Sequence, residues 1–319
     1  MNLDNLDEKI LAYLDNNART PSTIIAKKLR VNKNVINYRI KNMEESGIIR
    51  GYHTLINSYK LGYQAYRLYL RFQYTDPKKE DEIKEHFVKC NNTWLISYLR
   101  GNWGFLVLFW VKNPAEIVAI MHEFMHKYRQ YVDDYCLVLY YGIGHYRYPF
   151  TKKHLKEKSN FNYFTLSEEV PIDKIDKKIL NFLSTNGRAS LLQIARELRL
   201  SHGAIRYRMK ALVKKGIIAG FRPVIDTKKI GYLLYKLDIN VKDGHTIDKI
   251  YSFAKEHEYI FYINNSLGYA DVEIEAQVTD SKEFFSILRE INEKFPGQIR
   301  NYSFFVVEEF IKTKYLPDI

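Results

Sequence analysis

One long stretch of the chain occurs twice, and this internal repeat limits the folds that the chain can adopt. Positions 3–63 align with positions 172–232 without a gap, and 24 of the 61 aligned positions are identical. Chance would leave only a few identities, so the repeat is a duplication. We therefore expect two units of the same kind on one chain.

The third predicted helix of each copy has one apolar and one polar side. Asn32 and Ser201 are good N-caps, and Gly47 and Gly216 are good C-terminal stops. A β-branched pair follows each stop and predicts a strand that begins a wing. Two short helices, a tight turn and a strand are typical of a winged helix-turn-helix domain. The apolar stripes are Ile36, Ile40 and Met43 in the first copy and Ile205, Met209 and Leu212 in the second.

About 80 residues of a different pattern follow each copy. Strand and helix patterns alternate there in the order β-α-β-β-α-β, which is the order of a ferredoxin-like sandwich. The predicted fold class is therefore α+β, with two winged helix-turn-helix domains each followed by a ferredoxin-like βαββαβ domain. The predicted domains are 1–63 and 171–232 for the winged helix-turn-helix domains, 64–144 and 233–319 for the ferredoxin-like domains, and 145–170 for a linker.

The formal charge of +12 is spread unevenly over these parts. Residues 1–63 carry +4 and residues 172–232 carry +10, whereas residues 233–319 carry −5. This division is what a polyanion-binding head on a neutral or acidic body needs. The longest apolar run, at 105–111, is too short to span a membrane and the N-terminus lacks a signal pattern, so we expect a cytoplasmic protein without a membrane partner. Two cysteines, Cys90 and Cys136, predict neither a disulfide framework nor a metal site.

Four short motifs of the first half resemble the leucine-responsive/asparagine-operon (Lrp/AsnC, or feast/famine) regulator family. They are LDxxDxxIL from Leu3, IAxxL from Ile25, INYRI from Ile36 and GIIRGY from Gly47. The resemblance implies transcriptional regulation, binding of double-stranded DNA through the third helix, dimerisation through the sheets and often an amino-acid effector. Members usually carry one such unit, so this chain looks like a covalent dimer. We expect an intrachain pseudo-dimer that also forms homo-oligomers.

In this family a Gly-x-x-Asp turn between the second and third strands of the sensing domain typically lies near the effector. The second half fits the pattern, with Gly268, Tyr269 and Asp271. The first half has Gly101 and Trp103, but a glycine replaces the aspartate. Effector binding is thus open in the second half and doubtful in the first, and a plain hairpin turn is the alternative in both.

The polar faces of the two third helices carry the residue types that read DNA. Asn and Gln suit adenine edges, Arg and Lys suit guanine, and phosphate contacts supply most of the affinity. Arg39 and Arg208 lie at the edge of the apolar stripe, so pairing with a carboxylate inside the domain is an equal alternative to binding DNA. The residues expected to face bases are Asn34, Asn37, Tyr38, His202, Arg206 and Tyr207, and those expected nearer phosphates are Lys33, Lys41, Lys210, Lys214 and Lys215.

The two polar faces differ, because Asn34 corresponds to Gly203 and Asn37 to Arg206. The halves should therefore prefer different half-sites, and a solvated helix face without DNA is the alternative.

Enzymatic functions find little support in the sequence, and no cofactor is predicted. His122, Glu123 and His126 form an HExxH pattern, but the apolar stripe of this helix turns both histidines to solvent and no third ligand is evident. The same two-domain architecture also resembles the sirohaem decarboxylases, which act on tetrapyrroles and do not bind DNA, and this is one alternative function. A third alternative is a sequence-tolerant architectural DNA-binding protein.

Overall fold

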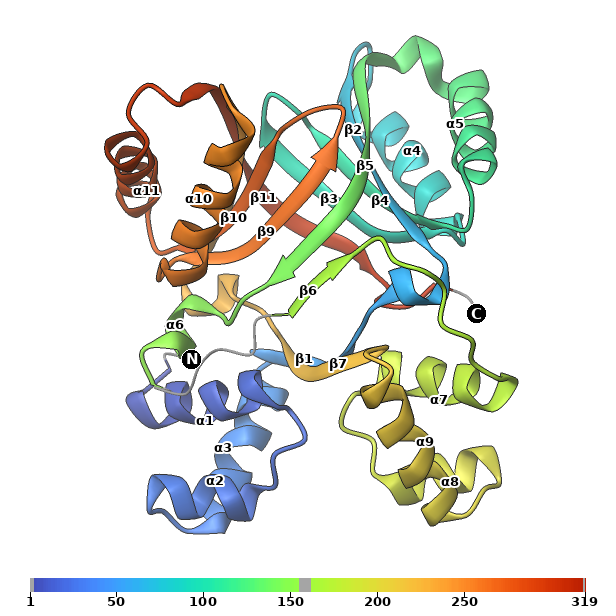
Figure 1. Ribbon diagram of the computed structural model, residues 1–319, viewed down its shortest axis with the longest axis vertical. Helices are drawn as coiled ribbons and strands as arrows, with labels where there is room; N and C mark the ends of the chain where they lie inside the picture. Colours follow the sequence, from blue (N-terminus) through green and yellow to red (C-terminus); the bar gives the residue numbers. More distant parts are fainter. Residues whose placement is uncertain (1–2, 155–161, 318) are drawn as a thin grey trace.

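Two three-helix heads form one end of the molecule in the computed structural model, which describes residues 3–154, 162–317 and 319 (Figure 1). Their apolar stripes are buried, and Asn32 and Ser201 cap the third helices as predicted. Ser190 and Gln193 form a capping box on α8. The first head contains α1 (Asn5–Asn16), α2 (Ser22–Leu29) and α3 (Lys33–Glu45), and the second contains α7 (Lys174–Thr185), α8 (Leu191–Leu198) and α9 (His202–Lys214).

The strand predicted after each third helix is present, and it pairs with its repeat in the other half of the chain and not with a second strand of its own head. Strand β1 (Ile49–Ile56) pairs antiparallel with β7 (Ile218–Ile225), so that each head contributes one strand to a shared ribbon. A single strand leaves its backbone groups unpaired, and its repeat in the second half of the chain satisfies them. The two heads are thereby joined to each other directly.

The other end of the molecule is a closed antiparallel barrel made by both ferredoxin-like halves. The strands follow the order β2-β4-β3-β11-β8-β10-β9-β5, and β5 pairs with β2 to close the ring. Strand β3 pairs with β11 and β5 with β9, so the two sheets join within one chain. The strands are β2 (Gln64–Phe72), β3 (Thr93–Gly101), β4 (Phe105–Val111), β5 (Val132–His145), β8 (Leu233–Val241), β9 (Ile260–Leu267), β10 (Val272–Val278) and β11 (Ile299–Thr313).

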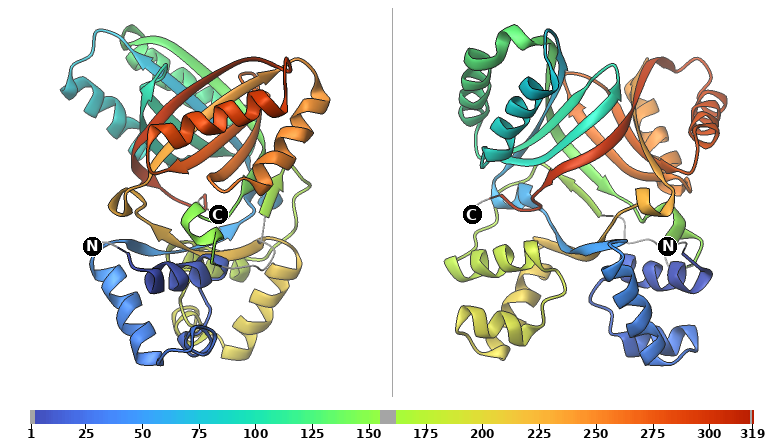
Figure 2. Two further views of the ribbon diagram at one scale, coloured as in Figure 1. Left: turned by 90° about the vertical axis from the view of Figure 1, so that its left-hand side faces the viewer. Right: turned by 180° about the vertical axis from the view of Figure 1, so that it is seen from behind.

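Four helices cover the outside of this barrel and confirm the α+β class (Figures 1 and 2). Apolar side chains between helices and strands form one core for each half, around Phe87 and Phe109 in the first and around Ile274 and Phe284 in the second. The helices are α4 (Pro77–Lys89), α5 (Pro114–Tyr128), α10 (Gly244–Glu256) and α11 (Ser281–Lys294).

The predicted linker contains regular structure. Helix α6 (Pro149–Lys152) lies against α1, where the Asp15 carboxylate accepts hydrogen bonds from the Tyr148 backbone N–H (3.0 Å) and the Thr151 hydroxyl (2.9 Å). Strand β6 (Asn162–Thr165) pairs with β5 and extends the sheet. The segment between them, 155–161, lies outside the described residues.

The chain crosses over between the heads and the barrel. In Figure 1 the first head lies beneath α10 and α11 of the second half, and the second head lies beneath α4 and α5 of the first half. Short 3-10 helices, η1 (Ser58–Leu61) and η3 (Lys228–Ile230), connect the ribbon to β2 and β8. Each head is therefore adjacent to the ferredoxin-like domain of the opposite half.

Candidate nucleic-acid interface

The two third helices present the residues that were expected to face bases. Asn34, Asn37, His202 and Arg206 are all exposed. The tyrosines beside them are also exposed, Tyr38 at 63% and Tyr207 at 77%. The structure thus holds two unlike polar surfaces at equivalent places on the two heads.

The lysines expected near phosphates are also exposed, but they are not equally free. Lys41 forms an ion pair with Glu45 at 3.4 Å on the same helix face. The Lys215 ammonium donates to the Pro171 carbonyl oxygen at 2.9 Å, at the far end of α9. Lys33, Lys210 and Lys214 are the other exposed lysines of this set.

Arg39 and Arg208 are paired with carboxylates inside their own heads. The Arg39 guanidinium lies 2.6 Å from the Asp4 carboxylate and 3.2 Å from Asp7 at the start of α1, and the hydrogen bond to Asp4 raises the pKa of Arg39. Arg208 has the same arrangement with the corresponding aspartates of α7. In the structure these arginines therefore attach the third helix to the first, which is the alternative that the sequence left open.

Two further arginines at the heads were not singled out from the sequence. Arg30 and Arg199 end α2 and α8 in the left-handed conformation, with φ of 56° and 54°, and both are exposed. They lie in the turns that lead into the third helices. The sequence signal was available, because both copies keep an arginine at this position.

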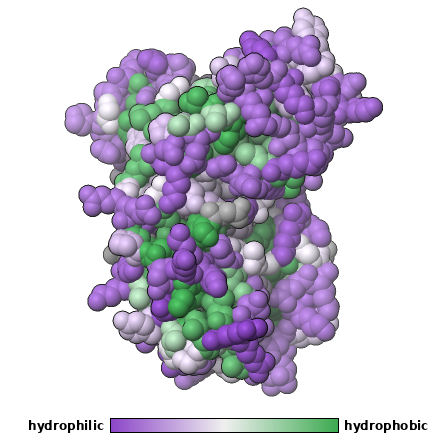
Figure 3. Space-filling view, turned by 90° about the vertical axis from the view of Figure 1, so that its right-hand side faces the viewer, coloured by the Kyte–Doolittle hydropathy of each residue, from purple (hydrophilic) through white to green (hydrophobic). Residues whose placement is uncertain are grey.

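Hydrophilic residues cover most of the side of the molecule that Figure 3 shows, and hydrophobic residues lie in patches between them. The exposed apolar side chains of the second head include Leu192 and Val213, each 51% exposed. No described helix is long and apolar enough to cross a bilayer.

Side chains from the two turns of the effector prediction contact each other. The Trp103 indole N–H donates to the Tyr269 hydroxyl at 3.1 Å, and that hydroxyl lies 3.2 Å from the Ser303 hydroxyl. Asp271 accepts a hydrogen bond from the Val241 backbone N–H at 2.8 Å, so one of its oxygens is used within the fold. Gly101 and Gly268 have φ of 145° and 106°. A side chain at Gly101 would lie 2.9 Å from Phe305 Cβ, so this turn requires glycine.

A surface cavity of about 360 Å³ lies beside the first of these turns. Arg71 lines it from β2, Glu80 from α4 and Glu308 from β11, together with Gly101. Arg71 is also held by Asp133, at 2.5 Å. The cavity therefore offers groups of both charges at the turn where the sequence made effector binding doubtful.

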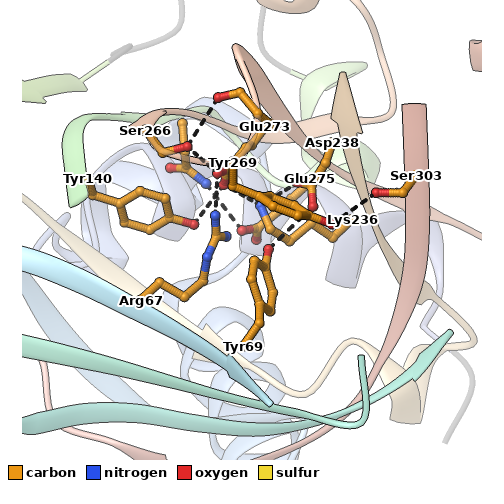
Figure 4. A network of polar contacts seen from close by, with 12 residues as sticks. Arg67, Tyr69, Tyr140, Lys236, Asp238, Ser266, Tyr269, Glu273, Glu275 and Ser303 are labelled. Atoms are coloured by element: carbon orange, nitrogen blue, oxygen red, sulfur yellow. Dashed lines mark hydrogen bonds and ion pairs between the residues drawn. The ribbon is translucent and has the colours of Figure 1, made fainter. Parts of the chain in front are cut away.

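A buried group of charged side chains occupies the barrel interior between the two halves (Figure 4). Glu273 accepts hydrogen bonds from the Arg67 guanidinium, the Lys236 ammonium (2.6 Å), the Tyr140 hydroxyl (2.8 Å) and the Ser266 hydroxyl (2.7 Å). Burial alone would raise the pKa of Glu273, but the positive charges of Arg67 and Lys236 outweigh it and lower that pKa to about 2. The carboxylate of the second half thus binds the guanidinium of the first.

Asp238 belongs to the same group but has the opposite shift. Its carboxylate lies 3.3 Å from the Lys236 ammonium and 3.4 Å from the Tyr69 hydroxyl. Burial raises the pKa of Asp238 to about 6 in spite of the nearby Lys236. Sequence reasoning missed this group because charged residues on a strand usually face water.

The sequence comparisons agree with the geometry of the heads. A model described as winged helix-turn-helix DNA-binding matches residues 3–50 and 172–219. The transcriptional regulator FL11 of Pyrococcus horikoshii is 30% identical over 149 residues, which cover 46% of this chain and 97% of the relative. The regulator Ptr1 of Methanocaldococcus jannaschii is 33% identical over 120 residues, covering 37% and 80%. The chain belongs to the Lrp/AsnC family of transcriptional regulators.

As a tandem member of the Lrp/AsnC family, the chain is longer than these relatives, and each matches less than half of it. A solved structure that covers 98% of this chain and 94% of its own is a siroheme decarboxylase, NirDL, with a TM-score of 0.67 and 14% identity. At that identity the likeness shows that the two proteins share a fold.

The HExxH histidines lie as the sequence predicted. His122 and His126 are exposed on α5, with ring centroids 4.4 Å apart. Within the part of the chain that the structure describes, no three His, Cys, Asp or Glu side chains are grouped to hold a metal ion.

Proposed function

We propose that this Lrp/AsnC protein is a transcriptional regulator that binds DNA as a single chain and reads two different half-sites. The observation that carries the proposal is that the heads expose unlike residues, Asn37 and Arg206, at equivalent positions of α3 and α9. Asparagine pairs well with adenine and arginine with guanine in the major groove. The operator should therefore be richer in A·T on one side and in G·C on the other.

The shared ribbon supports this reading because it fixes one head of each kind in every molecule. A homodimer presents the same helix twice and matches a palindrome. Here the pairing of β1 with β7 joins two unlike helices, so a single chain has a direction along the duplex. Arg30, Arg199, Lys33, Lys210 and Lys214 are exposed, and their positive charges support the proposal because they can contact phosphates.

Selection of bound duplexes from a random pool tests the proposal. We expect an asymmetric consensus, with a specific affinity at least about 10³-fold above that for random DNA. The Arg206→Asn variant should shift the second half-site toward A·T, and Asn34→Gly with Asn37→Arg should shift the first toward G·C. If the duplexes selected by the native chain have a perfectly palindromic consensus, the two heads do not prefer different half-sites and the proposal is refuted. Equal affinity for all sequences would favour an architectural role.

The fold shared with the siroheme decarboxylase leaves tetrapyrrole chemistry as the alternative. Side chains fill the centre of the barrel here, since Arg67, Tyr69, Lys236 and Glu273 are buried and bonded to one another or to neighbouring residues. The exposed basic helices are better suited to DNA than to a tetrapyrrole. Haem-like absorption of the purified chain, without salt-dependent DNA binding, would favour the enzyme.

A further inference from the structure

Each recognition helix ends on a lysine that comes from the opposite half of the chain. The Lys229 ammonium donates to the Ser46 carbonyl oxygen at the end of α3, at 2.8 Å. The Lys60 ammonium donates to the Lys215 carbonyl oxygen at the end of α9, also at 2.8 Å. Lys60 and Lys229 occupy the same position in the two copies of the repeat. We call these two contacts the lysine clamps.

The ribbon explains why each clamp reaches across. Strands β1 and β7 are antiparallel, with Ile56 opposite Ile218, so the end of one strand lies beside the start of the other. The Asn57 N–H donates to the Ile217 carbonyl oxygen at 2.8 Å, just after α9. Helix η1 therefore starts next to the end of the opposite recognition helix, and η3 does the same for α3.

The glycines that end the recognition helices make room for the clamps. Gly47 and Gly216 adopt φ of 70° and 68°, the usual geometry of a helix stop. An added Cβ would lie 2.7 Å from Lys229 Nζ at Gly47 and 2.8 Å from Lys60 Nζ at Gly216. The last carbonyls of a helix carry partial negative charge, so an ammonium placed there is favourable.

We propose that Lys60 and Lys229 are positioning residues that fix the tilt and separation of the two recognition helices and thereby set the half-site spacing of the operator. This inference rests on the proposed DNA-binding function. Within its own head, each helix is held by its buried apolar stripe and by the ion pairs of Arg39 or Arg208. The bond from the opposite half to the end of the helix also ties it to the body that carries its partner.

Each clamp lysine precedes, by seven residues in the sequence, a cation of the charged group inside the barrel. Lys60 comes four residues before β2, which carries Arg67, and Lys229 comes four residues before β8, which carries Lys236. A shift of either strand would move the lysine that holds the opposite helix. The clamps therefore give the barrel a short physical connection to the spacing of the heads.

A phosphate contact is the competing role for these lysines, and the helix geometry separates the two roles. Asn34 lies at the start of α3 and Ser46 at its end, about 18 Å apart at 1.5 Å per residue. A lysine that binds phosphate lowers the salt dependence of DNA binding when it is removed, by about 0.9 in the log–log slope. Loss of a positioning residue leaves that slope unchanged and alters the preferred spacing.

The experiment compares the full-length chain with its Lys60→Met/Lys229→Met variant on the selected operator, with the distance between half-sites varied in single base-pair steps. Methionine keeps the length of the side chain and removes the ammonium. Lys228→Met is the matched control, because Lys228 is an exposed neighbour outside both clamps. We expect the native chain and the control to prefer one spacing, and the double variant to lose about fivefold of that preference with an unchanged salt slope.

An unchanged spacing profile in the double variant would overturn the proposal, and so would a lower salt slope at an unchanged spacing. If the double variant fails to fold, each single methionine variant should broaden the spacing profile in part. Lys60→Arg keeps a hydrogen-bond donor at this position, so its spacing profile should match that of the native chain. A native chain that binds no operator at all would instead refute the proposed function.

Discussion

Replacing Glu273 with leucine would leave two buried cations without the carboxylate that they share. The Arg67 and Lys236 side chains are each 1% exposed and Glu273 is 0% exposed, so water cannot replace the lost partner. Breaking a buried ion pair from one side costs about 3–5 kcal/mol. The fall of the Glu273 pKa from its ordinary 4.5 to about 2 corresponds to about 3 kcal/mol at 1.36 kcal/mol per unit. We expect Glu273→Leu to lower the free energy of unfolding by about 4 kcal/mol.

Urea unfolding followed by tryptophan fluorescence measures this loss of stability, because the tryptophans report on the barrel. The three tryptophans, Trp94, Trp103 and Trp110, all belong to the first half of the barrel. Glu293→Leu on the exposed face of α11 is the control and should change stability by less than about 0.5 kcal/mol.

The triple variant Arg67→Met/Lys236→Met/Glu273→Leu removes both charges together with their partner. It should recover part of the stability that the single variant loses, because an apolar replacement of buried ion pairs is often neutral, and Asp238, which then lacks Lys236, is driven to its neutral form by burial. A loss below about 1 kcal/mol in Glu273→Leu, or a triple variant as unstable as the single one, would show that the charged group does not hold the halves together.

The Glu273→Leu variant should also change how the free energy of unfolding depends on pH. The pKa of Glu273 is lower in the folded chain than in the unfolded chain, so its stabilisation is present above pH 4.5 and is lost as the pH falls toward 2. The pKa of Asp238 is raised to about 6, so its contribution is present below pH 3.8 and is lost as the pH rises through 6. Other carboxyls with lowered pKa values, such as Asp4 and Asp173, also lose stabilisation in acid, so Glu273→Leu should make the loss between pH 4.5 and 2 smaller and not remove it. An acid loss as large as that of the native chain would contradict the assignment.

Two further predictions concern the ligands. DNA affinity should fall with salt at about 0.9 log units per neutralised phosphate, and in a salt titration Lys214→Met should lower that slope by about 0.9, whereas Arg39→Met should leave it unchanged, because Arg39 is bonded to Asp4. An amino-acid effector bound in the cavity beside Gly101 should stabilise the chain by about 2.7 kcal/mol at 100 times its dissociation constant, and Arg71→Ala should remove that shift in a thermal-unfolding assay. A native chain that none of the twenty amino acids stabilises would count against this site.

The heads and the order of the barrel elements could be predicted because local signals specify them. Asn32 and Ser201 cap the third helices as expected, and the run 105–111 is the strand β4 over the same residues. These features depend on neighbours a few positions away. Periodicity and capping therefore suffice to place them.

The contacts between the two halves could not be predicted, because they join residues far apart in the sequence. The sequence predicted that β1 begins a wing, because no residue near it in the sequence indicates a partner strand in the other half of the chain. Arg67 and Glu273 looked like ordinary strand charges, and only closure of the barrel turns both inward. Lys60 and Lys229 were likewise visible as a repeated lysine, but their role depends on the crossing of the chain.

The single-chain barrel also changes how the protein responds to its own abundance. A regulator assembled from two separate chains loses its paired form upon dilution, so its occupancy on DNA falls more steeply than its copy number. In this chain the partner of each half is covalently attached, and the strand pairs β3–β11 and β5–β9 form at any concentration. Operator occupancy by one such molecule should therefore rise in proportion to its concentration, without the concentration threshold that dimer assembly imposes. A few copies per cell would then be enough to act.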